Sequence, residues 1–169
     1  MDKFFVDIRS ILTTTPARWH RLAEALPEEL VQRPPKLGEW SALECLVHIL
    51  DTEAVFNFRL GCFLRGEDFP DFNPDSEGSP AEGKSTKDLA GELDRQRQES
   101  LKALETLSPA DLERTARHAE LGPVTLRQML NEWAAHDLMH TVQAERAVMQ
   151  PFIQGSGAWQ VYFQDHLVE

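Results

Sequence analysis

Two histidines, His136 and His140, stand four residues apart in the run EWAAHDLMHTVQ. On an α-helix this spacing places both imidazoles on one face, one turn apart, where they can bind a single metal ion from the same side. Trp133, Met129 and Met139 lie on that face too, which indicates that it turns inward. The spacing alone also fits a chance pair of histidines held by hydrogen bonds in a core, so both readings stay open at this point.

A third histidine, His48, lies in the apolar segment LECLVHILDTEAVF. It belongs to a more polar strip of that segment, while the densest apolar face, which carries Leu46 and Leu50, lies on another side. If the polar strip packs against His136 and His140, three ring nitrogens meet. Three histidine ligands leave an open coordination position, which is typical of catalytic metal sites. The pattern therefore predicts a site for one divalent metal ion formed by these three histidines.

Four further polar residues are candidates for supporting roles at this site. Glu132 lies one turn before His136 and could be a fourth ligand or accept a hydrogen bond from an imidazole. Asp51, Asp137 and Gln143 could orient the imidazoles through the ring nitrogens that do not face the metal. Asp137 projects sideways from His136, so a helix cap or a contact between helices is an equally good interpretation for it.

Other kinds of site fit the sequence less well. Di-iron sites in helical bundles use Glu-x-x-His motifs, and no glutamate stands three residues before any of the three histidines. Cys45 lies one turn before His48, but a small buried hydrophobe is the better interpretation for it. No Gly-rich phosphate loop and no Ser-His-Asp signature is present. The remaining histidines have no ligand-like partner nearby and are predicted to lie at the surface: His20, His118 and His166.

The apolar periodicity predicts four main helices that must position these groups. The first covers residues 2–26 and is expected to kink or restart at Pro16, with Thr15 as a new N-cap. Capping boxes, formed by Ser or Thr with Glu or Gln three residues later, open two of the other helices. These three helices are predicted to run from Ser41 to about 64, from Ser85 to about 107, and from Thr125 to about 149, before Pro151.

The connections between the helices are long. Residues 65–84 are rich in proline, glycine and acidic residues, and a loop of this length within a compact domain is typically functional or mobile. Residues 115–124 read as irregular, after a short helical turn that begins at Ser108. The tail from Gly155 carries three aromatic residues, which we expect to tie it to the body of the protein.

This arrangement predicts an all-α fold, a four-helix bundle with long connections and a short C-terminal tail. The length of 169 residues suits a single domain spanning residues 1–169.

The charge balance argues against several classes of partner. The chain has 17 basic and 28 acidic residues, a net charge of -11, and no basic run. Nucleic acids and anionic membrane surfaces are therefore poor partners, because both recruit clustered Lys and Arg. The N-terminus lacks the apolar core of a signal peptide, no stretch is long enough to span a bilayer, and the two cysteines read as free thiols. These features predict a cytoplasmic protein.

The segments GEWSALECLVHILDTE and EWAAHDLMHTVQAERAV resemble the DinB-like superfamily of four-helix-bundle proteins. The resemblance extends over nearly the whole chain. It rests on His48 in a helix that opens with Trp-Ser, and on the run His-Asp-x-x-His-x-x-Gln that begins at His136 and ends at Gln143. Members of this superfamily bind a divalent metal, often zinc or nickel, through three such histidines, and many form dimers. The resemblance thus implies that His48 is the third ligand and that the protein can form a homodimer.

The same resemblance implies a class of reaction. Relatives include S-transferases that use bacillithiol or mycothiol, and enzymes similar to maleylpyruvate isomerase. We therefore expect a metal-dependent transferase that joins a small-molecule thiol to an electrophilic substrate. One alternative is a metal-dependent hydrolase, with Glu132 or Glu44 as general base. Another is a non-catalytic, stress-related protein in which the metal only holds the helices together.

Overall fold

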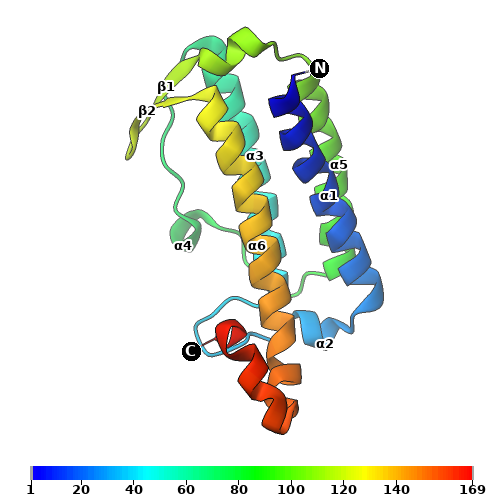
Figure 1. Ribbon diagram of the computed structural model, residues 1–169. Coiled ribbons are helices and arrows are strands. Elements are labelled where there is room, and N and C mark those ends of the chain that lie inside the picture. Colours follow the sequence, from blue (N-terminus) through cyan, green and yellow to red (C-terminus); the bar gives the residue numbers. More distant parts are fainter. Residues whose placement is uncertain (1, 169) are drawn as a thin grey trace.

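The structure is a computed structural model that describes residues 2–168 and is mostly helical. α1 packs against α5 and α6, and α3 packs against the same two helices, so α1 and α3 occupy opposite corners of a four-helix bundle (Figure 1). The predicted all-α four-helix bundle is confirmed. Its long helices are α1 (Lys3–Ala25), α3 (Ala42–Arg65), α5 (Thr86–Glu105) and α6 (Leu126–Gly155).

Helices α3 and α5 run in the same direction, although they follow each other in the chain (Figure 1). The connection between them, residues 66–85, therefore returns along the bundle and carries the one-turn helix α4 (Pro74–Glu77). Asp51 on α3 holds this crossover, because its carboxylate accepts hydrogen bonds from the backbone N–H and the hydroxyl of Ser79 at 2.7 and 2.8 Å. The predicted acidic loop is thus a crossover that is fastened to α3.

Two of the four helices begin at the predicted capping boxes. Ser41 Oγ accepts a hydrogen bond from the backbone N–H of Glu44, whose carboxylate accepts one from the backbone of Ser41 in return. Thr125 and Gln128 form the same reciprocal pair at the start of α6. α3 ends at Gly66, which adopts the left-handed conformation, with φ of 72°, that favours glycine. These local signals fix where α3 and α6 begin and where α3 ends.

The predicted break at Pro16, with Thr15 as an N-cap, is wrong, because α1 passes through the proline without interruption. A proline inside a helix removes the N–H that would bond the carbonyl four residues earlier, which here belongs to Leu12. That carbonyl instead accepts a hydrogen bond from Arg97 Nη1 on α5 at 2.8 Å. A side chain distant in the sequence thus satisfies the carbonyl that the proline leaves free.

The segment predicted as irregular from residue 115 to 124 is a β-hairpin, so that prediction is wrong. Strands β1 (Thr115–His118) and β2 (Gly122–Thr125) pair antiparallel, after the short 3-10 helix η1 (Pro109–Glu113). Phe69 of the crossover adds a parallel bridge to His118, with backbone hydrogen bonds of 3.1 Å on both sides. Phe69 thus adds a backbone contact to the hairpin from a segment that the local sequence does not reveal.

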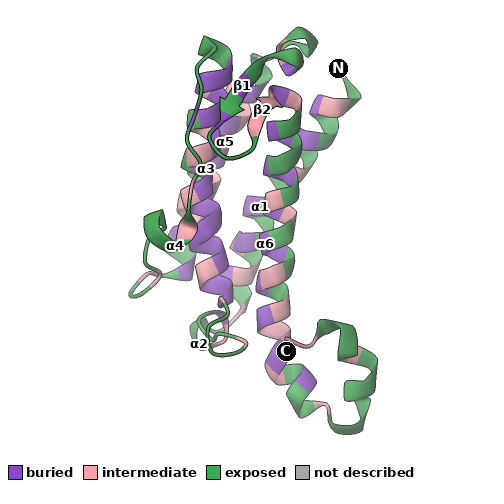
Figure 2. Cartoon of the chain, turned by 90° about the vertical axis from the view of Figure 1, so that its left-hand side faces the viewer, coloured by how far each residue is buried: buried purple, intermediate pink, exposed green. Residues whose placement is uncertain are grey.

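The end of the chain also differs from the prediction. α6 continues through Pro151 for another turn and places Ile153 in the core. The following 3-10 helix η2 (Gly157–His166) is largely exposed (Figure 2), and its Trp159 and Tyr162 are 68% and 77% exposed. The tail is instead held by polar contacts, since Arg146 and Gln150 donate hydrogen bonds to backbone carbonyls of the last residues.

Apolar side chains form two buried clusters along the bundle, one around Trp133 and the other around Trp19. α3, α5 and α6 also carry buried polar side chains, among them His48, His140 and Arg97, while His136 is half-buried. Among residues 2–168, no helix combines the length and the apolar composition that crossing a membrane would require. The short helix α2 (Glu28–Val31) closes the end of the bundle where α3 begins.

Candidate metal centre

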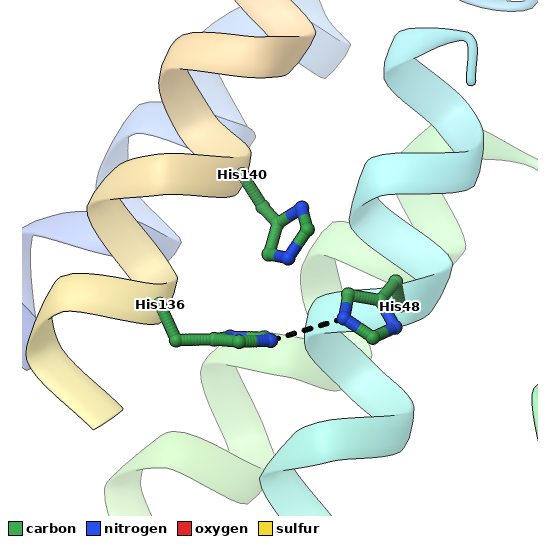
Figure 3. Close-up of side chains that lie close together, drawn as sticks. All are labelled: His48, His136 and His140. Carbon is green, nitrogen blue, oxygen red and sulfur yellow. Dashed lines mark hydrogen bonds between the residues drawn. The ribbon is translucent and has the colours of Figure 1, made fainter. Parts of the chain in front are cut away.

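The structure brings His48, His136 and His140 together. His48 projects from α3 and the other two from successive turns of α6, and Figure 3 shows the three rings turned toward one another. One nitrogen of each ring lies within 4.8 Å of the others, and His48 Nε2 lies 3.0 Å from His136 Nε2. α3 and α6 are antiparallel neighbours, and His48 on α3 contacts both His136 and His140 on α6.

The spacing of the nitrogens fits one shared ion. Two neighbouring ligands at 2.0–2.1 Å from the same metal are separated by about 2.8 to 3.4 Å, from octahedral to tetrahedral geometry. The 3.0 Å between His48 Nε2 and His136 Nε2 falls in this range. The Nδ1 atoms of both rings are buried, and neither has a hydrogen-bond partner within residues 2–168. If these nitrogens carry the ring protons, both Nε2 lone pairs point to the same space.

Burial keeps the three imidazoles neutral at physiological pH. Desolvation, followed by the charge of His140, lowers the pKa of His48 to about 4. Desolvation, with smaller contributions from the neighbouring histidines and arginines, lowers the pKa of His136 to about 3. Desolvation also lowers the pKa of His140. A metal binds the neutral imidazole, so the site holds its ligands in the form that an ion requires.

Aromatic side chains enclose the three rings. Trp40 lies on His140 with ring centroids 5.8 Å apart and contacts His48 at 4.9 Å. Phe56 meets His136 edge-on at 5.5 Å. Neither aromatic residue was assigned to the site from the sequence. Trp40 is, however, the tryptophan of the Trp-Ser pair that carries the family resemblance, and that pair was the signal that could have placed it beside the site.

Of the residues predicted to orient the imidazoles, Gln143 has that contact. Its Oε1 lies 2.8 Å from His140 Nδ1, so that ring donates through Nδ1 and turns Nε2 toward the other histidines. Asp51 and Asp137 do not fill the predicted role, because neither makes a hydrogen bond to an imidazole. Asp51 binds Ser79 of the crossover, and Asp137 binds a buried arginine.

Glu132 does not belong to the cluster of possible ligand atoms, which His48, His136 and His140 form. The structure therefore does not place it as the fourth ligand that the sequence offered. Its carboxylate instead lies 3.8 Å from Arg59 Nη1, and the side chain is 53% exposed. Cys45 is fully buried and also lies outside the cluster, as expected for a small buried hydrophobe. The described residues thus offer three protein ligands and leave room for a further one from solution.

A buried ion pair network lies next to the histidines and was missed from the sequence. Arg97 on α5 donates to both carboxylate oxygens of Glu53, at 2.7 to 3.1 Å, and to Asp137 at 2.6 and 3.2 Å. All three side chains are at most 1% exposed. Asp137 directly follows His136, so the network fixes the α6 backbone at the site. Asp137 therefore makes the contact between helices that was its alternative interpretation.

A cavity of about 400 Å³ opens beside the three histidines. Its walls include apolar groups of Phe56, Phe72 and Leu121 as well as the charged residues Arg59 and Glu132. A second hollow of about 250 Å³ lies between α3 and the crossover, and it shares Trp40, His48 and Pro74 with the first. The histidines therefore face space that could hold a small substrate.

His118 is not at the surface, contrary to the prediction. It is 7% exposed, packs edge-on against Phe69 and lies 3.3 Å from Arg59 Nη2. The β-hairpin, which the sequence did not predict, carries it inward. His20 and His166 are partly or well exposed, as predicted.

The chain belongs to the DinB superfamily, whose family profile matches residues 11–144. A curated protein of Bacillus mycoides (strain KBAB4), named “Putative metal-dependent hydrolase”, is 23% identical over 144 residues, which cover 83% of this chain and 81% of that protein. The solved structure of YfiT from Bacillus subtilis, described as “a probable metal-dependent hydrolase with an unusual four-helix bundle topology”, superposes with a TM-score of 0.79. That match has 15% sequence identity and covers 90% of this chain and 89% of the other. The four-helix topology is therefore shared.

Proposed function

We propose that this protein is a metal-dependent enzyme in which His48, His136 and His140 hold one divalent ion that faces the 400 Å³ cavity. The observation that carries the proposal is the convergence of three neutral imidazole nitrogens from two helices, within 4.8 Å of one another, at a cavity wall. An all-imidazole donor set suits zinc and nickel, so these are the ions that we propose.

A divalent ion held in this way lowers the pKa of a water or thiol at its open position and polarises a substrate carbonyl. The residues of the chain supply the rest of the site. Trp40 and Phe56 pack against the imidazoles and keep bulk water from them. Gln143 fixes the orientation of His140. Glu132, one helical turn before His136 and at the cavity wall, can accept a proton from a nucleophile.

Hydrolysis of a small substrate is the first reaction that we propose. The names given to the Bacillus mycoides protein and to YfiT support it, since both describe metal-dependent hydrolases. The carboxylate of Glu132 at the cavity wall also supports it, because hydrolysis needs a group that removes a proton from water.

A thiol-dependent transfer is the second candidate, and the two hollows favour it. They meet at Trp40 and His48, so a small thiol and an electrophilic substrate could reach the same ion from different sides. A hydrolase acting on one small substrate has no need of the second hollow. The two reactions differ only in the nucleophile that occupies the open position.

Metal analysis of protein purified without a histidine tag tests the proposal. We expect about one equivalent of zinc or nickel in the wild type and less than about a tenth in His48→Ala and His140→Ala. His166→Ala is the matched control, because its side chain is exposed and is not part of the cluster, and it should bind metal like the wild type. Equal metal content in all four proteins would contradict the assignment.

Spectroscopy of the cobalt-substituted protein separates the two reactions. If the second candidate is correct, an added small thiol changes the visible spectrum of the cobalt and an electrophile is consumed only when the thiol is present. If hydrolysis is correct, thiols leave the spectrum unchanged and ester or amide substrates are cleaved without them. Glu132→Gln should then lower the rate of hydrolysis by about a hundredfold or more.

A further inference from the structure

Arg59 is a buried cation in the wall of the cavity that the three histidines face. It follows His48 on α3 by about three helical turns, so it lies on the same side of the helix. Its side chain is only 8% exposed, and burial lowers the pKa of its guanidinium. A buried cation is normally compensated by close hydrogen-bond acceptors. The contacts of Arg59 therefore show whether its charge is compensated within the protein.

The acceptors around Arg59 do not satisfy it. A guanidinium carries five N–H donors. The Nε of Arg59 is buried without a hydrogen-bond partner in the described chain, and Nη1 has only the carboxylate of Glu132 at 3.8 Å, which is longer than a hydrogen bond. The faces of Phe56 and Phe69 lie 5.9 and 5.4 Å from the guanidinium carbon and supply no lone pair.

Within residues 2–168, the side chain that lies within hydrogen-bond distance of Arg59 is that of His118, and it is itself a donor. His118 Nδ1 faces the backbone N–H groups of Glu120 at 3.1 Å and Leu121 at 3.3 Å, so it must accept from them. A neutral ring then carries its proton on Nε2. This atom lies 3.3 Å from Arg59 Nη2, so two donors meet with no acceptor between them.

We propose that Arg59 and His118 form a subsite that binds the carboxylate of a small substrate or co-substrate whose reacting end lies at the three histidines. Both residues line the same cavity as His48 and His136. A carboxylate oxygen placed between the two facing donors would accept from both. Such charge-assisted pairing of a guanidinium with a planar carboxylate is strong and directional.

The charges of the cavity favour a carboxylate over a phosphate. Asp71, Glu120 and Glu132 line the same space, so a dianion would meet more repulsion than a monoanion. The apolar walls at Phe56, Phe72 and Leu121 suit a hydrocarbon or aromatic body. The substrate class is therefore a small carboxylic acid with an apolar body. This inference deepens the proposed function, because it assigns a substrate class to the same cavity.

Binding of 4-fluorobenzoate to the full chain, stripped of metal with a chelator and followed by fluorine NMR, tests the subsite. We expect the wild type to bind this probe at least about tenfold more tightly than the neutral 4-fluorobenzamide and more tightly than 4-fluorophenyl phosphate. Arg59→Gln should remove that preference for the carboxylate, while Arg59→Lys should keep part of it. Tighter binding of the phosphate than of the carboxylate would overturn the assigned class.

A second substitution, which should strengthen carboxylate binding, keeps the proposal testable if the Arg59 variant does not fold. Glu132 is half-exposed and competes for Arg59, so Glu132→Gln should fold and bind 4-fluorobenzoate several-fold more tightly than the wild type. If Arg59 only pairs with Glu132 for structure, this substitution leaves carboxylate binding unchanged, and the proposal is overturned.

The metal proposal and the subsite proposal can be contradicted independently of each other. His48→Ala should retain binding of 4-fluorobenzoate in the metal-free state, because its side chain is not part of the subsite. Loss of binding in His48→Ala together with unchanged binding in Arg59→Gln would overturn the subsite and leave the metal proposal intact. Binding that depends on Arg59 in a protein that takes up no metal would support the subsite and remove the metal proposal.

Discussion

The neutral state of the imidazoles has a consequence for stability at the residue scale. In the unfolded chain a histidine titrates near 6.5, whereas the folded pKa values are about 4 for His48 and about 3 for His136. As the pH falls below 6.5, the unfolded chain binds protons that the folded chain does not, so the metal-free protein loses stability as pH falls from 6.5 through 4.

Urea unfolding of the metal-free protein between pH 7.5 and 4 measures this effect. The double variant His48→Gln, His136→Gln lacks both titrating groups, so its stability should fall less than that of the wild type over the same window. A parallel fall in both proteins would show that other groups, such as the many surface carboxylates, control the acid sensitivity.

Gln143 is the residue that the structure places directly against an imidazole nitrogen. Removing its acceptor by Gln143→Leu frees His140 to rotate and lowers its basicity, so we expect metal affinity to fall about tenfold to a hundredfold. Competition with a chromophoric chelator measures the affinity. Gln98→Leu, an exposed position on α5, is the control and should bind metal as the wild type does.

At the scale of the elements, Arg97 joins the helices around the site. It bonds Glu53 on α3, Asp137 on α6 and the carbonyl of Leu12 on α1. Substitution by Met leaves two buried carboxylates without their cation, although Ser100 still donates a hydrogen bond to Glu53, so Arg97→Met should lower the free energy of unfolding by about 3–5 kcal/mol. Arg95→Met is the matched control, because that side chain is 67% exposed, and it should change stability by under about 1 kcal/mol. Equal effects in chemical denaturation would refute the role given to the network.

The crossover between α3 and α5 depends on Asp51. Replacing it by Ala removes both hydrogen bonds to Ser79 and should free the segment around α4. We expect faster amide hydrogen exchange at residues 75–79, with little change in α1 and α6. Unchanged exchange in this segment would mean that other contacts hold the crossover.

The sequence predicted those parts of the fold that depend on local chemistry. The capping residues Ser41 and Thr125 set the starts of α3 and α6, and helical spacing placed His136 and His140 on one face. The continuous α1 could not be predicted, because the carbonyl freed by Pro16 is satisfied by Arg97, about eighty residues away. Such long-range contacts leave no signal in a local pattern.

The burial of His118 was missed for the same reason. It follows from the β-hairpin and from the bridge to Phe69, and both pair segments that are separate in the sequence.

For the whole molecule, the arrangement of the bundle explains the site. α3 and α6 are adjacent and antiparallel, and their packing brings His48 to the pair His136 and His140 on α6. The homodimer stays a prediction. Phe152, Trp159 and Tyr162 are each more than 60% exposed near the end of the chain. Sedimentation at micromolar concentration would test it, and a dimer that dissociates in the variant Trp159→Ser, Tyr162→Ser would support this surface.

The most direct test of the metal centre is anomalous diffraction from crystals of untagged protein, recorded on both sides of the zinc and nickel absorption edges. We predict one anomalous peak about 2.0–2.1 Å from a nitrogen of each of His48, His136 and His140, with a further position open to the cavity. Two results would contradict it: no peak between the three imidazoles, or a peak whose remaining position is closed by a protein side chain such as that of Glu132.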